Sequence, residues 1–238
     1  VITLDDKYLQ SGGRVFLSSN QAMVRLPLDQ ARRDRAAGLK TAGYISGYRG
    51  SPLGVYDSAL WGAQQLLDEH HIVFRPGLNE ELAVSAIRGT QQLDWFGKSA
   101  FEGIFGLWYG KGIGVDRAGE SLKLGNFEGA AAKGGFLVVA GDDHGGKSSD
   151  SAHQSEHTLI AAMVPMLYPA TIGEIIEFGL LARVGAGTLV AVGEVGRAHA
   201  VDHQQDAVAA DAADHEVLEA GAVRVVADRD TRLVAHEI

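Results

Sequence analysis

Short apolar runs alternate along the chain with amphipathic segments and glycine-rich turns. The clearest strand pattern is the continuous apolar run at residues 135–141, which ends in a polar loop and is typical of a parallel strand covered on both faces. Shorter apolar runs predict strands at residues 41–46, 72–74 and 103–109. Helical spacing predicts helices at residues 21–37, 57–70 and 171–181, and one that begins near Glu80. The alternation predicts an α/β fold, a three-layer αβα domain with a mainly parallel sheet, over residues 1–181.

In the helix expected at residues 21–37, the apolar residues are predicted to face inward. The charged residues Arg32, Arg33, Asp34 and Arg35 are predicted to face outward.

The composition changes after about residue 181. Residues 183–238 contain no Lys, aromatic, Ser, Pro or Met, and they predict strands at 190–195 and 222–226 and a helix at 207–220. We therefore expect a domain at 1–181 followed by an atypical Ala/Val/Asp-rich tail at 182–238. Its composition fits either an ordinary sequence of a GC-rich organism or an aberrant, frameshifted or truncated continuation. Because the chain does not begin with Met, we expect it to be a piece of a longer protein.

Charge and composition limit the partners of the chain. The formal net charge of −9 argues against nucleic acid and against a polybasic role at a membrane surface. The absence of cysteine excludes disulfides, thiolate metal sites and a cysteine-ligated iron–sulfur cluster within these 238 residues. No long apolar run predicts a membrane span and the start lacks the layout of a signal peptide, so we expect a cytoplasmic protein.

Three polar loops follow predicted strands, at residues 48–54, 79–81 and 141–150. Because ligands bind beyond the carboxyl ends of parallel strands, we expect these loops to converge on one site. Asn79 is the predicted N-cap of a helix whose first turn carries Glu80, against the positive end of the helix dipole. Glu80 can serve the helix there or hydrogen-bond a ligand nitrogen. Lys111 and Arg117 flank a glycine-rich turn, where they could contact an anion or remain exposed loop charges.

Two further motifs leave different functions open. Residues 153–157, His-Gln-Ser-Glu-His, fit the His-x-x-Glu-His pattern of a zinc hydrolase, in which the two histidines would ligate zinc from one helix and Glu156 would act as base. Glu174 or Glu177 would have to supply a third ligand. Residues 141–148 formally match the phosphate loop of a nucleotide-binding α/β domain, although two aspartates in the cradle would repel a triphosphate.

Five motifs occur in the order found in one family. They are Ser18-Ser-Asn-Gln-Ala, Tyr44-Ile-Ser-Gly-Tyr-Arg-Gly-Ser-Pro-Leu-Gly54, Asn79-Glu80, Trp108-Tyr-Gly-Lys-Gly-Ile-Gly-Val-Asp-Arg117, and Gly141-Asp-Asp-His-Gly-Gly-Lys-Ser-Ser-Asp-Ser-Ala-His-Gln-Ser-Glu156. Through them, residues 1–181 resemble the N-terminal part of indolepyruvate ferredoxin oxidoreductase, and most closely its long, fused form.

The resemblance implies a thiamine-diphosphate-dependent 2-oxoacid:ferredoxin oxidoreductase in which this domain holds the aminopyrimidine ring of the cofactor. The family's catalytic glutamate, which hydrogen-bonds a nitrogen of that ring, falls on Glu80. The resemblance also implies cofactor contacts at Asn79, Gly50, Ser51 and Pro52. Its implied substrate contacts are Ser51, Arg49, Ser148 and Ser149.

The implied reaction is oxidative decarboxylation of an aryl 2-oxoacid to an acyl-CoA, with electrons passed to ferredoxin. The chain has no Gly-Asp-Gly segment ending in Asn to hold the diphosphate through Mg²⁺, so we expect another domain or subunit to bind both. The iron–sulfur clusters would lie elsewhere in the enzyme, which we expect to be a homodimer when complete. On this interpretation the chain supplies the aminopyrimidine half-site only and is inactive alone.

Overall fold

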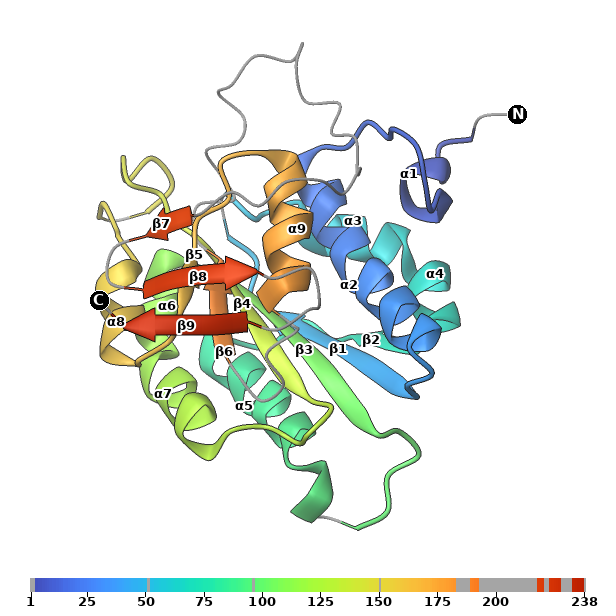
Figure 1. The fold of residues 1–238 in the computed structure, drawn as a ribbon. Helices are drawn as coiled ribbons and strands as arrows, with labels where there is room; N and C mark the ends of the chain where they lie inside the picture. Colours follow the sequence, from blue (N-terminus) through green and yellow to red (C-terminus); the bar gives the residue numbers. More distant parts are fainter. Residues whose placement is uncertain are drawn as a thin grey trace.

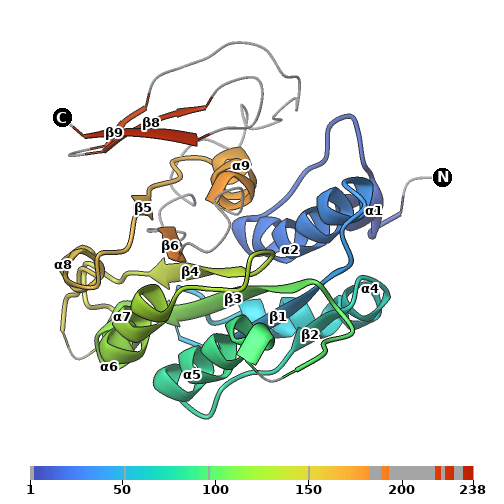
Figure 2. The same cartoon turned by 60° about the horizontal axis from the view of Figure 1, so that its bottom comes forward.

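The computed structural model describes residues 3–50, 52–95, 97–149 and 151–182, and beyond them only four strands, β6 to β9. Six parallel strands form one sheet in the order β2-β1-β3-β4-β6-β5 (Figures 1 and 2). The strands are β1 (Thr41–Gly47), β2 (Ile72–Phe74), β3 (Gly103–Lys111), β4 (Gly135–Gly141), β5 (Met166–Leu167) and β6 (Leu189–Val192). The predicted parallel sheet is confirmed.

Helices cover both faces of this sheet (Figure 2). The helices are α1 (Asp6–Leu9), α2 (Ser19–Ala36), α3 (Tyr56–Gly62), α4 (Gln64–Glu69), α5 (Glu80–Gln91), α6 (Gly112–Arg117), α7 (Gly119–Glu128), α8 (Glu156–Ala161) and α9 (Ile172–Ala182), with a 3-10 turn at Leu93–Trp95. Helices α2 and α9 pack on one face, and α5, α6 and α7 on the other. The predicted three-layer αβα fold is therefore confirmed, although the helix expected at residues 57–70 is divided into α3 and α4.

Strand β4 shows how the sequence produces the two layers. All seven of its residues are buried. Leu137 and Val139 join the apolar cluster beneath α2 and α9, whereas Phe136, Val138 and Ala140 join the cluster beneath α5 and α7. Because successive side chains of a strand point to opposite faces, a continuous apolar run is what a sheet covered on both sides requires.

Helix α2 begins with a capping box, in which the Ser18 hydroxyl accepts from the amide of Gln21 and the Gln21 side chain accepts from the amide of Ser18. The expectation that Asp34 faces outward is wrong. Asp34 is buried, and its carboxylate accepts hydrogen bonds from the Thr41 hydroxyl at 2.6 Å and the Gln30 amide at 2.7 Å. Burial of this charge is tolerated because both carboxylate oxygens have donors.

A polar pair lies inside the layer between the sheet and α3. The Tyr109 hydroxyl donates to the buried Asp57 carboxylate at 2.6 Å, and the Tyr56 ring meets the Tyr109 ring edge-on at 4.9 Å between centroids. Burial, followed by the hydrogen bond to Asp57, raises the pKa of Tyr109 far above its ordinary value. The phenol therefore stays protonated and remains a donor to Asp57.

Strands β7 (Leu218–Ala220), β8 (Val223–Ala227) and β9 (Leu233–Glu237) form a separate antiparallel sheet. The helix predicted at residues 207–220 is wrong where it overlaps β7, and the rest of it lies outside the described residues. Strand β6 lies beyond residue 181 and pairs with β4 in the main sheet. The division of the chain into a domain at 1–181 and a tail at 182–238 remains a prediction.

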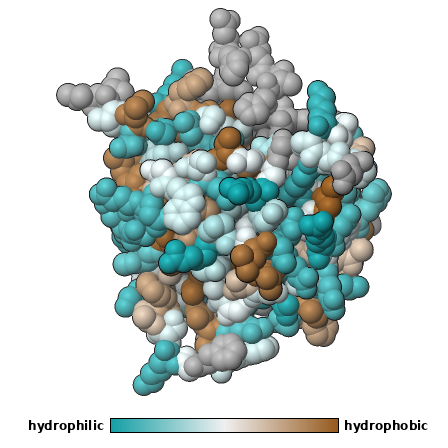
Figure 3. All heavy atoms as spheres, turned by 180° about the vertical axis from the view of Figure 1, so that it is seen from behind, coloured by the Kyte–Doolittle hydropathy of each residue, from teal (hydrophilic) through white to brown (hydrophobic). Residues whose placement is uncertain are grey.

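On the face opposite to that of Figure 1, hydrophobic residues are scattered among hydrophilic ones (Figure 3). Within the part of the chain that the structure describes, no helix combines the length and apolar character needed to cross a membrane.

Candidate functional site

The loops that follow β1, β2 and β4 meet at one edge of the sheet. The Gly77 amide, after β2, donates to the carbonyl of Gly47 at the end of β1, at 2.8 Å. The β1 and β4 loops are also in contact, because a Cβ added at Gly141 would lie 2.8 Å from Leu53 Cγ and 3.1 Å from Pro52 Cγ. The parallel topology thus brings the predicted loops together at the carboxyl ends of the strands.

The start of α5 is built as the sequence predicts. Asn79 has extended backbone angles, and its side-chain oxygen accepts a hydrogen bond from the Leu82 amide at 2.8 Å. Glu80 is the first residue of the helix, and its backbone carbonyl accepts a hydrogen bond from the buried Trp108 indole at 3.1 Å. The cap and the indole together fix the position from which the Glu80 side chain projects.

The Glu80 carboxylate is buried against α6. Glu80 is only 6% exposed. A Cβ at Gly114 of α6 would lie 3.0 Å from Glu80 Cδ, 2.8 Å from Oε1 and closer still to Cγ, so only glycine leaves room for this side chain. Among the described residues, Oε2 is buried and accepts no hydrogen bond. The guanidinium of Arg117, two-thirds exposed, lies 3.8 Å from it. A buried carboxylate oxygen without a donor is energetically costly, and a ligand N–H would satisfy it.

Lys111, the last residue of β3, links the loops after β1 and β4. Its ammonium donates to the carbonyl of Ser148 at 2.6 Å and to the Ser148 hydroxyl at 3.0 Å, and it lies 3.8 Å from the Asp143 carboxylate. Gly50 lies on its other side, since a Cβ there would be 3.4 Å from Lys111 Cβ. The anion that Lys111 contacts is therefore a carboxylate of the same chain.

The phosphate-loop alternative is not supported by the β4 loop. The amides of Lys147 and Ser148 donate to the Asp143 carboxylate at 3.1 and 2.7 Å. The Ser148 amide contributes most to holding the pKa of Asp143 below its usual value. A phosphate loop needs these amides free and a helix directly after the Lys-Ser pair, but α8 begins only at Glu156.

The residues predicted to contact substrate differ in whether their polar groups already have hydrogen-bond partners. The Ser148 hydroxyl is engaged by Asp143 and Lys111. The Ser149 hydroxyl is buried and has no hydrogen-bond partner in the described part of the chain. Arg49 is exposed at the start of the β1 loop. Ser51 lies outside the described residues.

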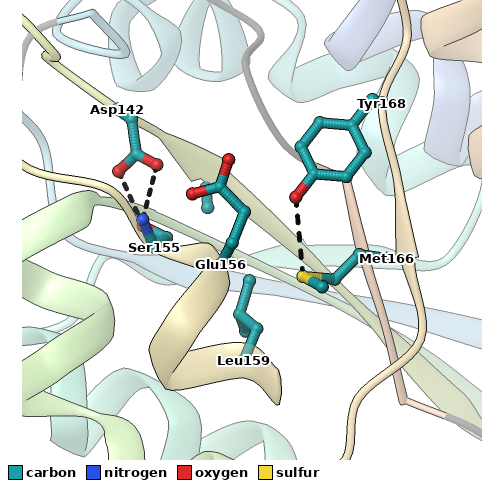
Figure 4. Close-up of a pocket in the computed structure, with 7 residues that line it drawn as sticks. Asp142, Ser155, Glu156, Leu159, Met166 and Tyr168 are labelled. Atoms are coloured by element: carbon teal, nitrogen blue, oxygen red, sulfur yellow. Dashed lines mark hydrogen bonds between the residues drawn. The ribbon is translucent and has the colours of Figure 1, made fainter. Parts of the chain in front are cut away.

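A histidine clamp joins α6 to the β4 loop. His153 Nε2 lies 2.7 Å from Asp116 on α6, and His153 Nδ1 lies 3.3 Å from Asp142. Asp142 also accepts two bonds from Ser155, from its amide at 2.8 Å and its hydroxyl at 2.6 Å (Figure 4). Burial acts to lower the pKa of His153, but the hydrogen bonds and charges of Asp116 and Asp142 outweigh it, and the pKa is raised.

The positions of His153 and Glu174 do not support the zinc-hydrolase alternative. Helix α8 begins at Glu156, so His153 lies outside it and cannot share a helical face with His157. Glu174, a suggested third ligand, instead accepts bonds from the Ala170 and Thr171 amides before α9. No cluster of three or more His, Cys, Asp or Glu residues within the described ranges could hold a metal ion. The cavity in Figure 4, beside Glu156, has a volume of about 10 Å³, which is room for about one water molecule.

Sequence reasoning missed three features of this site. These are the role of Gly114 behind Glu80, the clamp through Asp116, Asp142 and His153, and the helix α6 itself. The one sequence signal was the glycine run at residues 110–114, which was interpreted as a turn. Helix α6 starts within it, at Gly112.

No known protein-family model matches the chain. Indolepyruvate oxidoreductase subunit IorA from Methanothermobacter marburgensis is 26% identical over 167 residues, 70% of this chain and 23% of that subunit. Its counterpart from Methanothermobacter thermautotrophicus is 24% identical over 169 residues, 71% and 24% of the two chains. A solved 2-oxoglutarate:ferredoxin oxidoreductase from Magnetococcus marinus superimposes with a TM-score of 0.53 at 14% identity, over 76% of this chain and 29% of that one.

These comparisons confirm the resemblance to indolepyruvate oxidoreductase that the five motifs indicate. The solved structure shows that the α/β fold of this chain also occurs in a 2-oxoacid:ferredoxin oxidoreductase. The chain spans about a quarter of the length of the two curated relatives.

Proposed function

We propose that the chain supplies the aminopyrimidine half-site of a thiamine-diphosphate-dependent 2-oxoacid:ferredoxin oxidoreductase of the indolepyruvate type. The observation that carries this proposal is the buried Glu80 carboxylate, whose Oε2 accepts no hydrogen bond from the described residues. The similarity to two IorA subunits supports it independently of the site.

The residues around Glu80 fit one edge of an aminopyrimidine ring. Glu80 would hydrogen-bond a ring nitrogen and favour the imino tautomer, whose ring N–H is the donor that Oε2 lacks. Asn79 fixes the first turn of α5, and Gly114 keeps the space that the carboxylate occupies. Thiamine diphosphate supplies the electron sink for decarboxylation of a 2-oxoacid, and the protein contributes binding, orientation and this carboxylate.

The adjoining loops would contact the rest of the cofactor and the substrate. We assign cofactor contacts to Gly50, Ser51 and Pro52 in the β1 loop, which packs on the end of β4. The 2-oxoacid carboxylate would meet Arg49, Ser51, Ser148 and Ser149. Of these, Ser149 has a buried hydroxyl with no partner in the described part of the chain, so it offers a free donor.

The remaining parts of the enzyme would lie outside this chain. We propose that another domain or subunit binds Mg²⁺ and the diphosphate, and that iron–sulfur clusters elsewhere pass electrons to ferredoxin. An aryl 2-oxoacid and CoA would be the substrates, in a homodimeric, cytoplasmic enzyme, and this chain alone would be inactive. The solved neighbour with 2-oxoglutarate, coenzyme A and succinyl-CoA bound supports the CoA assignment only by shared fold.

The test compares Glu80→Gln with Glu81→Gln, an exposed acid one residue along the same helix. In the complete enzyme that contains this chain, Glu80→Gln is expected to lower the rate of CoA-dependent indolepyruvate oxidation by about 10²-fold or more, whereas Glu81→Gln leaves it unchanged. Binding of thiamine to the chain, followed by NMR shifts of the α5 amides, is a second measurement that does not depend on turnover. Equal oxidation rates in the two variants, or equal thiamine-induced shifts of the α5 amides, would show that Glu80 does not have this role.

A further inference from the structure

A basic hollow lies at the other edge of the sheet, where β1 and β2 begin. It is open to solvent and has a volume of about 270 Å³. Its lining residues are Ala31, Arg35, Gly38, Leu39, Lys40, Thr41, His70 and His71. We propose that this basic hollow binds a small phosphate-bearing anion, independently of the chemistry at the Glu80 edge.

Two permanent cations in the hollow form no ion pair within 4 Å among the residues that the structure describes. They are Arg35, in the last turn of α2, and Lys40, just before β1. The Lys40 ammonium lies 5.8 Å from the centre of the Phe101 ring, which leaves its hydrogen-bond donors unused.

Hydrogen bonds partly compensate the negative end of the α2 dipole. The amides of Ala37, Gly38 and Leu39 donate to the carbonyls of Arg33, Arg35 and Asp34 at 2.9–3.0 Å. These bonds satisfy three of the last four carbonyls of the helix, which reduces the partial negative charge that its C-terminus presents to an anion.

The acids around the hollow are also engaged. Asp34 lies behind it and accepts bonds from Thr41 and Gln30. On α4, Asp68 accepts from Gln64 and Glu69 accepts from Gln65. Glu102 accepts the backbone amide of Lys40 at 2.7 Å. Among the residues that the structure describes, Asp68, Glu69 and Glu102 form no ion pair with Arg35 or with the Lys40 ammonium.

His70 is placed to respond to an anion. Its Nδ1 lies 2.8 Å from the Leu66 carbonyl, so Nδ1 carries the proton and Nε2 is the titrating atom. Burial, and then the charges of Arg32 and Arg35, lower the pKa of His70, while the hydrogen bond to the Leu66 carbonyl and the charge of Glu69 act in the opposite direction. A bound anion would offset those two arginines and raise the pKa, so anion binding is expected to be coupled to proton uptake at Nε2.

His71 contributes an imidazole at a position that favours glycine. It follows the C-cap of α4 with a φ of 56°, in the left-handed region. Glycine is the usual residue at such a helix end, although histidine tolerates the conformation better than most others. The His71 ring lies 5.5 Å from the Phe101 ring between centroids, beside the same ring that the Lys40 ammonium approaches.

The size and charge of the hollow favour phosphate over a monocarboxylate. A volume of about 270 Å³ holds a phosphate group with a small organic part and is below the usual range for drug-sized ligands. Arg35, Lys40 and a protonated His70 together match a dianion. Arginine also binds phosphate oxygens through two parallel N–H groups.

The experiment titrates the whole chain with inorganic phosphate and, separately, with glycerol phosphate, by calorimetry and by NMR of the histidine ring protons. The variant is Arg35→Gln, and the matched control is Arg33→Gln, an exposed arginine of the same helix that does not line the hollow. We expect saturable binding that shifts His70, an affinity about tenfold lower in Arg35→Gln, and an unchanged affinity in Arg33→Gln. Tighter binding of glycerol phosphate would identify a phosphomonoester as the ligand, and tighter binding of inorganic phosphate would identify the free ion.

Two further measurements separate anion binding from effects of the substitutions on the fold. Sulfate stays a dianion between about pH 6 and pH 8, so its tighter binding at the lower pH would report on the histidines and not on the ligand. His71→Gly is expected to keep the thermal stability of the parent while weakening phosphate binding. Titrations that do not saturate, equal losses in the two arginine variants, or an unmoved His70 resonance would each overturn the proposal.

Discussion

Replacing Gly114 by alanine tests whether α6 is shaped around the Glu80 carboxylate. The added methyl would lie 2.8 Å from Oε1 and 3.0 Å from Cδ of Glu80 and closer still to Cγ, nearer than a Cβ approaches its neighbours in folded proteins, so either the side chain or the helix must move. Overpacking of this kind costs about 1–3 kcal/mol, whereas alanine in a helix gains about 1 kcal/mol over glycine. The steric cost is therefore expected to cancel or exceed the gain in propensity.

The matched control is Gly89→Ala, on the helix that Glu80 begins. Gly89 is exposed, and an added Cβ there would meet nothing within 4 Å, so the variant keeps the helix-propensity gain alone, about 0.5–1 kcal/mol of stabilisation. Thermal unfolding followed by circular dichroism is expected to place Gly114→Ala below Gly89→Ala by about 4–8 °C, which corresponds to about 2 kcal/mol in a domain of this size. If Gly114→Ala proved as stable as Gly89→Ala, the close contact with Glu80 would be refuted.

Three other predictions concern single contacts. Asn79→Ala removes the cap of α5 and is expected to cost about 1 kcal/mol in urea unfolding; no loss would mean that the cap is replaced by solvent. Tyr109→Phe leaves the buried Asp57 without its phenol donor and is expected to cost about 1.5–3 kcal/mol by the same measurement, so a neutral result would contradict that bond. His153 has a raised pKa in the folded state, so its contribution to stability is complete below the unfolded value of about 6.5 and is lost as the pH rises through the folded value. The stability gap between the parent and His153→Gln should therefore narrow as the pH rises above about 6.5, and a constant gap would argue against the clamp.

Strands β1 to β4 were predictable because their apolar runs are bounded by turn residues. Strands β2 and β4 have the limits that the sequence indicates, and the N-cap of α5 follows from Asn79 standing before an acidic first turn. Helix α6 was not predictable in this way. Glycine is a poor helix former, and here Gly114 is present to make room for Glu80, which is distant in sequence.

The candidate site was predictable in its position more than in its contacts. Parallel topology places the three loops at one edge, but no sequence rule states that Lys111 bonds to Ser148 or that Asp143 accepts the loop amides. Asp34 is a similar case, since helical spacing predicts an exposed residue and only the Thr41 hydroxyl on the next strand explains its burial. Pairings between elements depend on tertiary structure, which periodicity within one element does not contain.

The position of β6 between β4 and β5 determines where the chain can be cut. Strand β5 is hydrogen-bonded only to β6 among the described strands, and β6 also covers one side of β4. Ending the polypeptide at residue 181 would therefore leave β5 without a pairing strand and turn β4, whose seven residues are all buried, into an open edge. Such an edge recruits further strands from other molecules, so a shortened product would be prone to aggregate, and recombinant versions need to extend at least through Val192.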